Sequence, residues 1–413
     1  MTRASETDDP DTQSGPVRTV FDTPKSLAIG LYMSIVGYSV LAGIPVIGTA
    51  WLTLLGFSEV EVGRVAGADL GGLSCGAVIA ALLVVRVNRR ALVVAGVIAA
   101  IAANLLCAVV DGYLGTLTLR FIAGVGSGVV TGIAVATLGG RRNPARAFNY
   151  LLFSFAFVQA GEMLLLPRLS MAQIYWLFAA SYLPVLLFLS WLPRHPHPVA
   201  HTPRDPALQR AAPLKVPALV PWLCLCAMAL TYVNIGAYWT YIELASADAG
   251  LEADWVSQTL VWVSFFSVAG CLFATLISDR FGIARPLLMT LLLHAAAVLI
   301  LVTDIDPPRF LISLYAFNFL WIFVDVYQMG SVANLDSNGR FASLMPAAQG
   351  LGQIIGPNLA ASLLAFDAGY SAVFLLCGSA SLAAFMVYAV AYYRLRQMNR
   401  APASDATRYQ AGL

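Results

Sequence analysis

Charged side chains are scarce in this chain. Only 11% of its 413 residues are Asp, Glu, Lys or Arg, whereas 59% are hydrophobic, and the mean hydropathy is +0.77. A soluble protein of this length needs a far more polar surface, so a soluble fold is excluded and the bilayer is the expected solvent. The net charge is only +2, and membrane topology accounts for the basic residues, so no nucleic-acid partner is expected.

Other chemical features are missing as well. The six cysteines all fall within apolar stretches, where they behave as small apolar residues, so neither a disulfide framework nor a metal site is expected. No Walker sequence occurs, so a gradient is the expected energy source, and we expect neither enzyme activity nor a cofactor. The first 24 residues are polar and lack the apolar core of a cleavable signal.

What the chain does contain is twelve apolar stretches. Each has roughly 20 residues, the length that a helix needs to cross a hydrocarbon core of about 30 Å. The pattern predicts an all-α integral membrane protein. The predicted spans are 26–50, 65–85, 91–110, 116–138, 148–167, 173–192, 217–241, 256–278, 286–303, 310–333, 342–365 and 370–393.

The basic residues indicate the orientation, because Lys and Arg near span ends stay on the cytoplasmic side. If both termini lie inside, the inner segments contain 20 of the 24 Lys and Arg residues, and the outer loops are mainly acidic. We therefore expect a multi-pass protein of the cytoplasmic (inner) membrane with both termini in the cytoplasm. It is expected to be a monomer whose partners are lipid and a small-molecule substrate.

An internal repeat divides the chain into two halves. Sliding the sequence by 194 residues matches landmarks in both loops and helices, which indicates the duplication found in many secondary transporters. The matched pairs are Tyr38 with Tyr232, Arg86 with Arg280, Arg146 with Arg340 and Gln159 with Gln353. The predicted organisation is a disordered cytoplasmic N-terminus over 1–25, a six-helix bundle over 26–193, a cytoplasmic linker over 194–215, a second bundle over 216–394 and a cytoplasmic tail over 395–413.

Three local sequences carry a family resemblance. Residues 275–282 read TLISDRFG, residues 83–90 read LVVRVNRR, and residues 120–128 read RFIAGVGSG. With the span number and the repeat, they resemble the major facilitator superfamily (MFS), whose loop signature is G-x-L-x-D-R-x-G-R-R/K and whose fourth helix contains R-x-x-x-G-x-G-x-G. The first-half copy departs from the signature at Val85 and Asn88. The resemblance covers the whole chain and implies two pseudo-symmetric six-helix bundles around a central cavity.

The signature loops predict a gate. An Asp-Arg pair at a cytoplasmic helix end can bridge to the neighbouring helix and hold the inner side closed. We predict this role for Asp279 and Arg280, and a weaker latch at Arg86 and Arg89, where the acid is replaced by Val85. The alternative is that these arginines only anchor the topology at the lipid surface.

Ionisable residues inside the spans predict the coupling site, because a charge near the bilayer centre costs at least about 2.5 kcal/mol. Glu162 and Asp325 lie deep in their spans, where exclusion of water favours the protonated carboxyl, so each can bind and release a proton. Asp69 and Arg120 are further candidates; Arg120 either pairs with Glu162 or Asp69 or binds an anionic substrate group. The alternative is a structural role in which neighbouring polar groups satisfy the acids.

Polar and aromatic residues on the spans that the resemblance places around the cavity predict the substrate site. They interleave hydrogen-bonding groups with ring faces, which suits a small polar or amphipathic solute, although packing alone also explains single aromatics. The predicted substrate-binding residues are Tyr38, Arg120, Gln159, Asn234, Tyr238, Trp239, Tyr241, Glu243, Asn318, Trp321, Asp325, Gln328 and Gln353.

We expect a secondary active transporter that moves a small organic solute by alternating access, with proton-coupled symport as the leading hypothesis. A proton-coupled antiporter that exports cationic or drug-like compounds is the alternative. The fifth span lacks the proline of the G-x-x-x-G-P-x-x-G element found in such exporters, and this favours uptake. A transporter-like sensor or scaffold is a remote alternative.

Overall fold

In the computed structural model the chain is helical, without a strand in the part that the structure describes: residues 20–84, 86–110, 112–141, 144–194, 219–281, 284–335, 341 and 344–400. The first half contains α1 (Pro24–Leu55), α2 (Glu59–Leu83), α3 (Arg89–Cys107), α4 (Tyr113–Gly139), α5 (Pro144–Leu165), α6 (Met171–Ser181) and α7 (Leu183–Leu187). The second half contains α9 (Leu219–Asp248), α10 (Ala253–Phe281), α11 (Ala284–Leu299), α12 (Pro307–Leu335), α13 (Met345–Ala365) and α14 (Gly369–Arg400).

Each predicted span coincides with a helix, which confirms the twelve-helix membrane fold. Within the described residues, nine helices are long and apolar enough to cross a membrane, and two shorter apolar helices accompany them. The sixth span is split after Tyr182, because Pro184 at the start of α7 cannot donate a backbone hydrogen bond. The predicted linker lies almost entirely outside the described residues, and α14 continues past the predicted boundary to Arg400.

Helix α13 is long enough to span a membrane, but it is less apolar than the nine spanning helices counted above. Its polar residues include Gln353 and Asn358, and it packs mainly against α9 and α2 rather than lying open to lipid. A helix that other helices shield from lipid can tolerate such residues.

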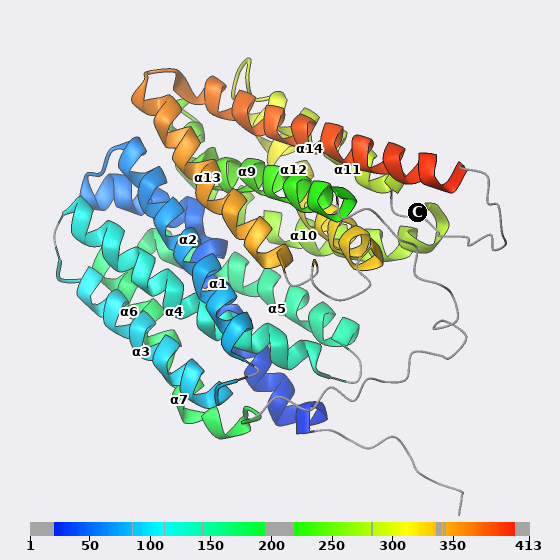
Figure 1. Ribbon diagram of the computed structural model, residues 1–413. Coiled ribbons are helices and arrows are strands. Elements are labelled where there is room, and N and C mark those ends of the chain that lie inside the picture. Colours follow the sequence, from blue (N-terminus) through cyan, green and yellow to red (C-terminus); the bar gives the residue numbers. More distant parts are fainter. Residues whose placement is uncertain are drawn as a thin grey trace, which may run out of the picture.

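The helix bounds reproduce the repeat. A shift of 194 residues places the first residue of α2, Glu59, on the first residue of α10, Ala253, and the first residue of α4, Tyr113, on that of α12, Pro307. Figure 1 shows the two halves as separate groups of helices, blue to green for the first and green to red for the second. They meet along a seam formed by α2 with α13, α5 with α10, and α1 with α9.

Glycines allow the closest helix approaches. Gly124 and Gly128 of α4 face α2, where a Cβ on either residue would strike the backbone at Asp69 or Leu73. The R-x-x-x-G-x-G-x-G element therefore serves close packing of α4 on α2. On the opposite face of α2, a Cβ on Gly67 would strike Asn358 and one on Gly71 would lie 2.8 Å from Ile354 Cγ1, both on α13.

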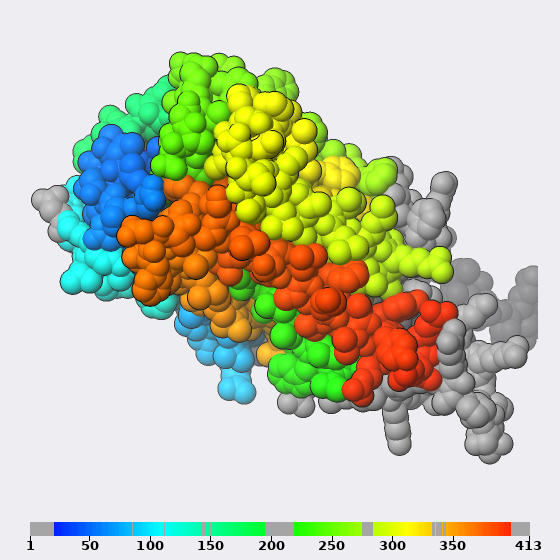
Figure 2. Space-filling model, turned by 90° about the horizontal axis from the view of Figure 1, so that it is seen from above, coloured from blue at the N-terminus to red at the C-terminus, as the bar shows by residue number. Residues whose placement is uncertain are grey.

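The molecule has two distinct ends. We call the end that carries the α1–α2, α9–α10 and α13–α14 connections the loop end, and the opposite end, where α1 begins and α14 ends, the terminal end. Among the described residues, four hydrogen bonds join the halves, and all involve residues toward the loop end of their helices. Figure 2 shows the orange residues of α13 lying directly against the blue residues of the first half. The seam is thus closed at the loop end.

Candidate functional site

Asp325 lies at the middle of the seam. Its Oδ2 accepts a 2.8 Å hydrogen bond from the Tyr232 hydroxyl on α9, whereas Oδ1, although buried, has no hydrogen-bond partner. Tyr38 of α1, in the other half, lies within electrostatic reach of the carboxyl. Trp321 is one turn earlier on α12 and also interacts with Asp325. The carboxyl therefore has one oxygen free to bind a proton or a substrate group.

The two tyrosines beside Asp325 are repeat counterparts. A shift of 194 residues converts Tyr38 into Tyr232, and α1 and α9 place them on either side of the carboxyl. Tyr232 was matched to Tyr38 in the repeat but was not predicted as a site residue. The repeat itself was the signal that could have found it, because a residue near the pseudo-twofold axis lies close to its own counterpart.

An aromatic layer bounds this site on the loop-end side. The indole N–H of Trp239 donates a 3.0 Å hydrogen bond to the Leu41 carbonyl of α1, and the Trp239 and Trp321 ring centroids are 6.0 Å apart. Further toward the loop end, the Tyr241 hydroxyl donates to the Glu59 carbonyl at 2.9 Å. Trp239 and Tyr241 therefore bridge the closed seam, and Trp321 packs against Trp239.

Two more acids contact α1. Glu162 on α5 lies beside Ser39 and Gly43, since a Cβ on Gly43 would be 3.2 Å from Glu162 Oε2. Glu243 on α9 lies beside Thr49. Neither Glu162 Oε2 nor Glu243 Oε2 has a hydrogen-bond partner, and neither acid forms an ion pair in the described part of the chain. Thr49 and Glu243 are themselves 194 residues apart, so this contact also lies near the pseudo-twofold axis.

Asp69 and Arg120 form a closed ion pair within the first half. Arg120 Nε donates to Asp69 Oδ2 at 2.8 Å, a second guanidinium N–H donates to the same oxygen, and Nη1 donates to Asn104 Oδ1 at 2.7 Å. The Tyr175 ring lies 5.7 Å from the guanidinium. Asp69 faces α4, on the side of α2 away from α13, so the predicted pairing with Asp69 is present but the pair points into the bundle, away from the seam.

Several predicted substrate residues are buried within the second half. Asn234 donates to Ser381 Oγ on α14 at 2.8 Å, Tyr238 shares a 2.8 Å hydrogen bond with Ser313, and Gln328 donates to Thr231 at 2.7 Å. Asn318 is fully buried and donates to its own helix. These hydrogen-bond partners all lie within the second half, on a neighbouring helix for Asn234, Tyr238 and Gln328 and on its own helix for Asn318. Gln159 and Gln353 are buried on α5 and α13.

The first-half gate arginines contact their own half. Arg86 is exposed, and Arg89 is buried with its guanidinium 5.0 Å from the Phe21 ring. The neighbouring Arg90 donates to the carbonyls of Leu192 and Ser190 at the end of the sixth span. Asp279 and Arg280 lie on α10, but their side chains are outside the described part. The inner gate therefore stays a prediction.

Arg64 is a polar residue of the seam that the sequence did not single out. Its Nη1 donates to Asn358 Oδ1 and its Nη2 to Ser362 Oγ, each at 3.0 Å, and both acceptors lie on α13 of the other half. The available signal was that only four basic residues lie outside the predicted inner segments, and Arg64 is one of them.

Comparisons with known proteins agree with this architecture. A family model described as "Uncharacterised MFS-type transporter YbfB" matches residues 44–390. The uncharacterized MFS-type transporter YceJ of Bacillus subtilis (strain 168) is 24% identical over 312 residues, which are 70% of this chain and 76% of that protein.

Similar solved structures include a mutant of the nucleoside transporter NupG, with a TM-score of 0.70 at 13% identity, covering 89% of this chain and 100% of that chain. An auto-inhibited POT family peptide transporter has a TM-score of 0.69 at 13% identity, covering 94% and 99%. The human organic anion transporter MFSD10 has a TM-score of 0.61 at 16% identity, covering 89% and 100%. At these identities the solved structures show a shared fold and do not indicate a substrate.

Proposed function

Because this chain belongs to the MFS-type transporter family whose model spans residues 44–390, we propose that it moves a small polar organic solute across the cytoplasmic membrane by proton-coupled symport. The observation that carries the proposal is Asp325, a carboxyl at the middle of the seam with one buried oxygen unpartnered and a tyrosine from each half beside it. A group that both halves contact can change its environment when the halves rock. This is what coupling a proton to solute movement requires.

The acids along α1 supply a route for the proton. Asp325 lies beside Tyr38, Glu162 beside Ser39 and Gly43, and Glu243 beside Thr49. From Tyr38 to Thr49 the helix rises about 16 Å toward the loop end. No basic residue pairs with these three carboxyls in the described part of the chain, so each can bind one proton as a neutral acid, release it to the next group and then accept another.

The closed loop end fits one state of an alternating-access cycle. The Trp239–Leu41, Tyr241–Glu59 and Arg64–Asn358 contacts hold the halves together on that side of Asp325. With the terminal end in the cytoplasm, as the distribution of basic residues favours, the proposed cycle assigns this state to the form that is closed to the outside. Solute and proton then leave toward the cytoplasm, and the loop-end contacts must break for reloading.

The decisive experiment measures proton movement in proteoliposomes that enclose a pH dye. Candidate solutes are first selected by thermal shift, beginning with nucleosides, small peptides and organic anions, because these are named for the similar structures. Adding a selected solute outside should acidify the lumen, because a symporter brings protons in with the solute. Solute entry without acidification would contradict symport.

Export of cationic compounds is favoured by one observation, namely the unpaired acids along the seam, which would also attract a cation. The same assay separates the two functions. An antiporter releases lumenal protons, so an added cation would make the lumen more alkaline. Binding without any flux would instead indicate a sensor or scaffold.

A further inference from the structure

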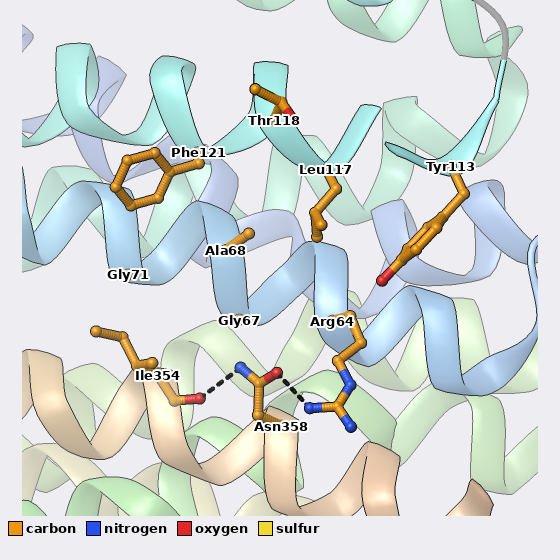
Figure 3. A pocket seen from close by; sticks show the side chains of 10 residues that line it. All are labelled: Arg64, Gly67, Ala68, Gly71, Tyr113, Leu117, Thr118, Phe121, Ile354 and Asn358. Carbon is orange, nitrogen blue, oxygen red and sulfur yellow. Dashed lines mark hydrogen bonds between the residues drawn. The ribbon is translucent and has the colours of Figure 1, made fainter. Parts of the chain in front are cut away.

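A groove opens on the outer surface of the molecule beside the seam, near the loop end. It has a volume of about 480 Å³ and is lined by α2 and α4 of the first half and by α13 of the second. Figure 3 shows its lining side chains, with Arg64 and Tyr113 toward one end and Phe121 and Ile354 toward the other. The groove does not include Asp325, and the proposed transport cycle uses only the Arg64–Asn358 contact at its edge, not the groove itself.

The end of the groove nearer the loop end is cationic. The Arg64 guanidinium donates to Asn358 and Ser362, which are both neutral, and no carboxylate forms an ion pair with it in the described part of the chain. The nearby carboxylate of Glu61 is occupied in capping α2, where it accepts from the Ser58 backbone N–H at 2.9 Å. In Figure 3 the Tyr113 hydroxyl points toward Arg64. A half-buried guanidinium that forms no ion pair in the described residues therefore lies beside a hydroxyl donor, with Glu61 also within electrostatic reach of Tyr113.

The other end of the groove is apolar and faces lipid. Phe121 and Ile354 line it, and Phe121 is 42% exposed on the outside of the bundle (Figure 3). Arg64 lies in the second turn of α2, and Gly71 lies about 10 Å deeper along the same helix. Charge near the membrane surface and apolar surface below it is the profile of a phospholipid, with its phosphate above its acyl chains.

We propose that this groove binds an anionic phospholipid, with the phosphate against Arg64 and Tyr113 and an acyl chain along Phe121 and Ile354. Charge complementarity favours an anionic headgroup, because a zwitterionic lipid brings its own cation to the phosphate. The occupant touches α2 and α4 of one half and α13 of the other. A bound lipid therefore holds the halves together at the loop end and favours the closed arrangement described here.

The test is lipid retention by the purified full-length protein in native mass spectrometry, with phosphatidylglycerol and phosphatidylcholine as probes. We expect the wild-type protein to retain phosphatidylglycerol in preference to phosphatidylcholine, and Arg64→Gln to lose that preference. Arg168→Gln is the matched control, because it removes an exposed arginine at the same end but outside the groove. Equal retention of phosphatidylglycerol by Arg64→Gln and Arg168→Gln would overturn the proposal.

Two further variants separate lipid binding from the Arg64 hydrogen bonds across the seam. Arg64→Lys keeps the cation but loses the two-pronged contact to α13, and should retain the lipid. Thr118→Trp adds bulk in the groove from an exposed position on α4 and leaves Arg64 untouched, so it should abolish the thermal stabilisation by phosphatidylglycerol. If Thr118→Trp keeps that stabilisation, or if inorganic phosphate alone reproduces it, the groove is not a lipid site.

Discussion

At the scale of single residues, two groups of ionisable side chains inside the helices differ in whether they are paired. Asp69 and Arg120 neutralise each other inside the first half, and Asn104 occupies a further donor of the guanidinium. Asp325, Glu162 and Glu243 have no cationic partner in the described residues and lie beside α1. The first group holds α2, α3 and α4 together, and the second is available for binding.

The first prediction concerns the contribution of the Asp69–Arg120 ion pair to the stability of the protein. Asp69→Asn leaves the Arg120 guanidinium buried without its counterion, so we expect a loss of about 3–5 kcal/mol. The double variant Asp69→Leu with Arg120→Met removes both charges and should be clearly more stable than the single variant. Thermal unfolding in detergent measures the stability of both variants. If the double variant is no more stable than Asp69→Asn, the unpaired charge of Arg120 is not the cause of the loss.

A second prediction concerns the hydrogen bond from the Tyr232 hydroxyl to Asp325. Tyr232→Phe removes the 2.8 Å hydrogen bond to Asp325 and leaves Trp321 as the remaining polar neighbour, at a cost of about 1.5–3 kcal/mol to the charged form. Proton-driven uptake should therefore fall by at least about tenfold. Tyr327→Phe, on the same helix as Asp325 but bonded to α10, is the control and should transport normally. Equal uptake by both variants would remove Tyr232 from the site.

At the scale of elements, α2 has two packing faces made by glycines. Gly72 and Gly76 allow the backbone of α4 to pack closely within the first half, whereas Gly67 and Gly71 allow α13 to pack closely across the seam. The first face is permanent in a rocking mechanism, and the second must open and close. Substitutions on the two faces should therefore act on different properties, the first on folding and the second on the conformational equilibrium.

A larger residue on the seam face should hold the loop end open. In Gly71→Val the added carbon meets Ile354 at 2.8 Å, and overpacking of this kind costs about 1–3 kcal/mol in the closed state. We expect lower thermal stability and slower transport. Gly161→Val on α5 meets nothing within 4 Å and serves as the control. If the two variants behave alike, the α2–α13 contact is not limiting.

At the scale of the whole molecule, the 194-residue repeat explains why Tyr38 and Tyr232 both lie beside Asp325. The pseudo-twofold axis runs between α1 and α9, so Tyr38 meets its counterpart Tyr232 across Asp325 and Thr49 meets its counterpart Glu243. Asp325 itself has Thr131 as its counterpart. The carboxyl therefore breaks the symmetry at the centre and gives the two halves different chemistry.

Alternating access predicts a change in exposure at the loop end. Ala361 is fully buried and lies against Gly63 of the other half. In a background with the exposed Cys75 and Cys226 replaced, Ala361→Cys should resist a membrane-impermeant maleimide at rest and react faster when solute and a proton gradient are supplied. Ala253→Cys, on the exposed start of α10, should react at a constant rate. A constant low rate at Ala361→Cys would argue against opening.

Hydropathy predicted the spans, and the 194-residue repeat predicted how their bounds correspond between the halves, because both signals depend only on position along the chain. The sequence did not predict how each helix is rotated about its own axis. In lipid, an apolar side chain is equally suited to a neighbouring helix or to the bilayer, so the apolar pattern did not show that Asp69 faces α4 or that Asn234 faces α14. Arg64 was overlooked because it lies in the predicted outer loop before the second span.

The most direct test of coupling at Asp325 compares two assays on the same proteoliposomes: accumulation of the solute driven by a proton gradient, and counterflow exchange without a gradient. Asp325→Asn should lose accumulation and keep counterflow, because the neutral amide mimics the protonated carboxyl and the halves can still rock with solute bound. Asp254→Asn, exposed at the start of α10, should keep both. Gradient-driven accumulation by Asp325→Asn at the wild-type level would contradict the account.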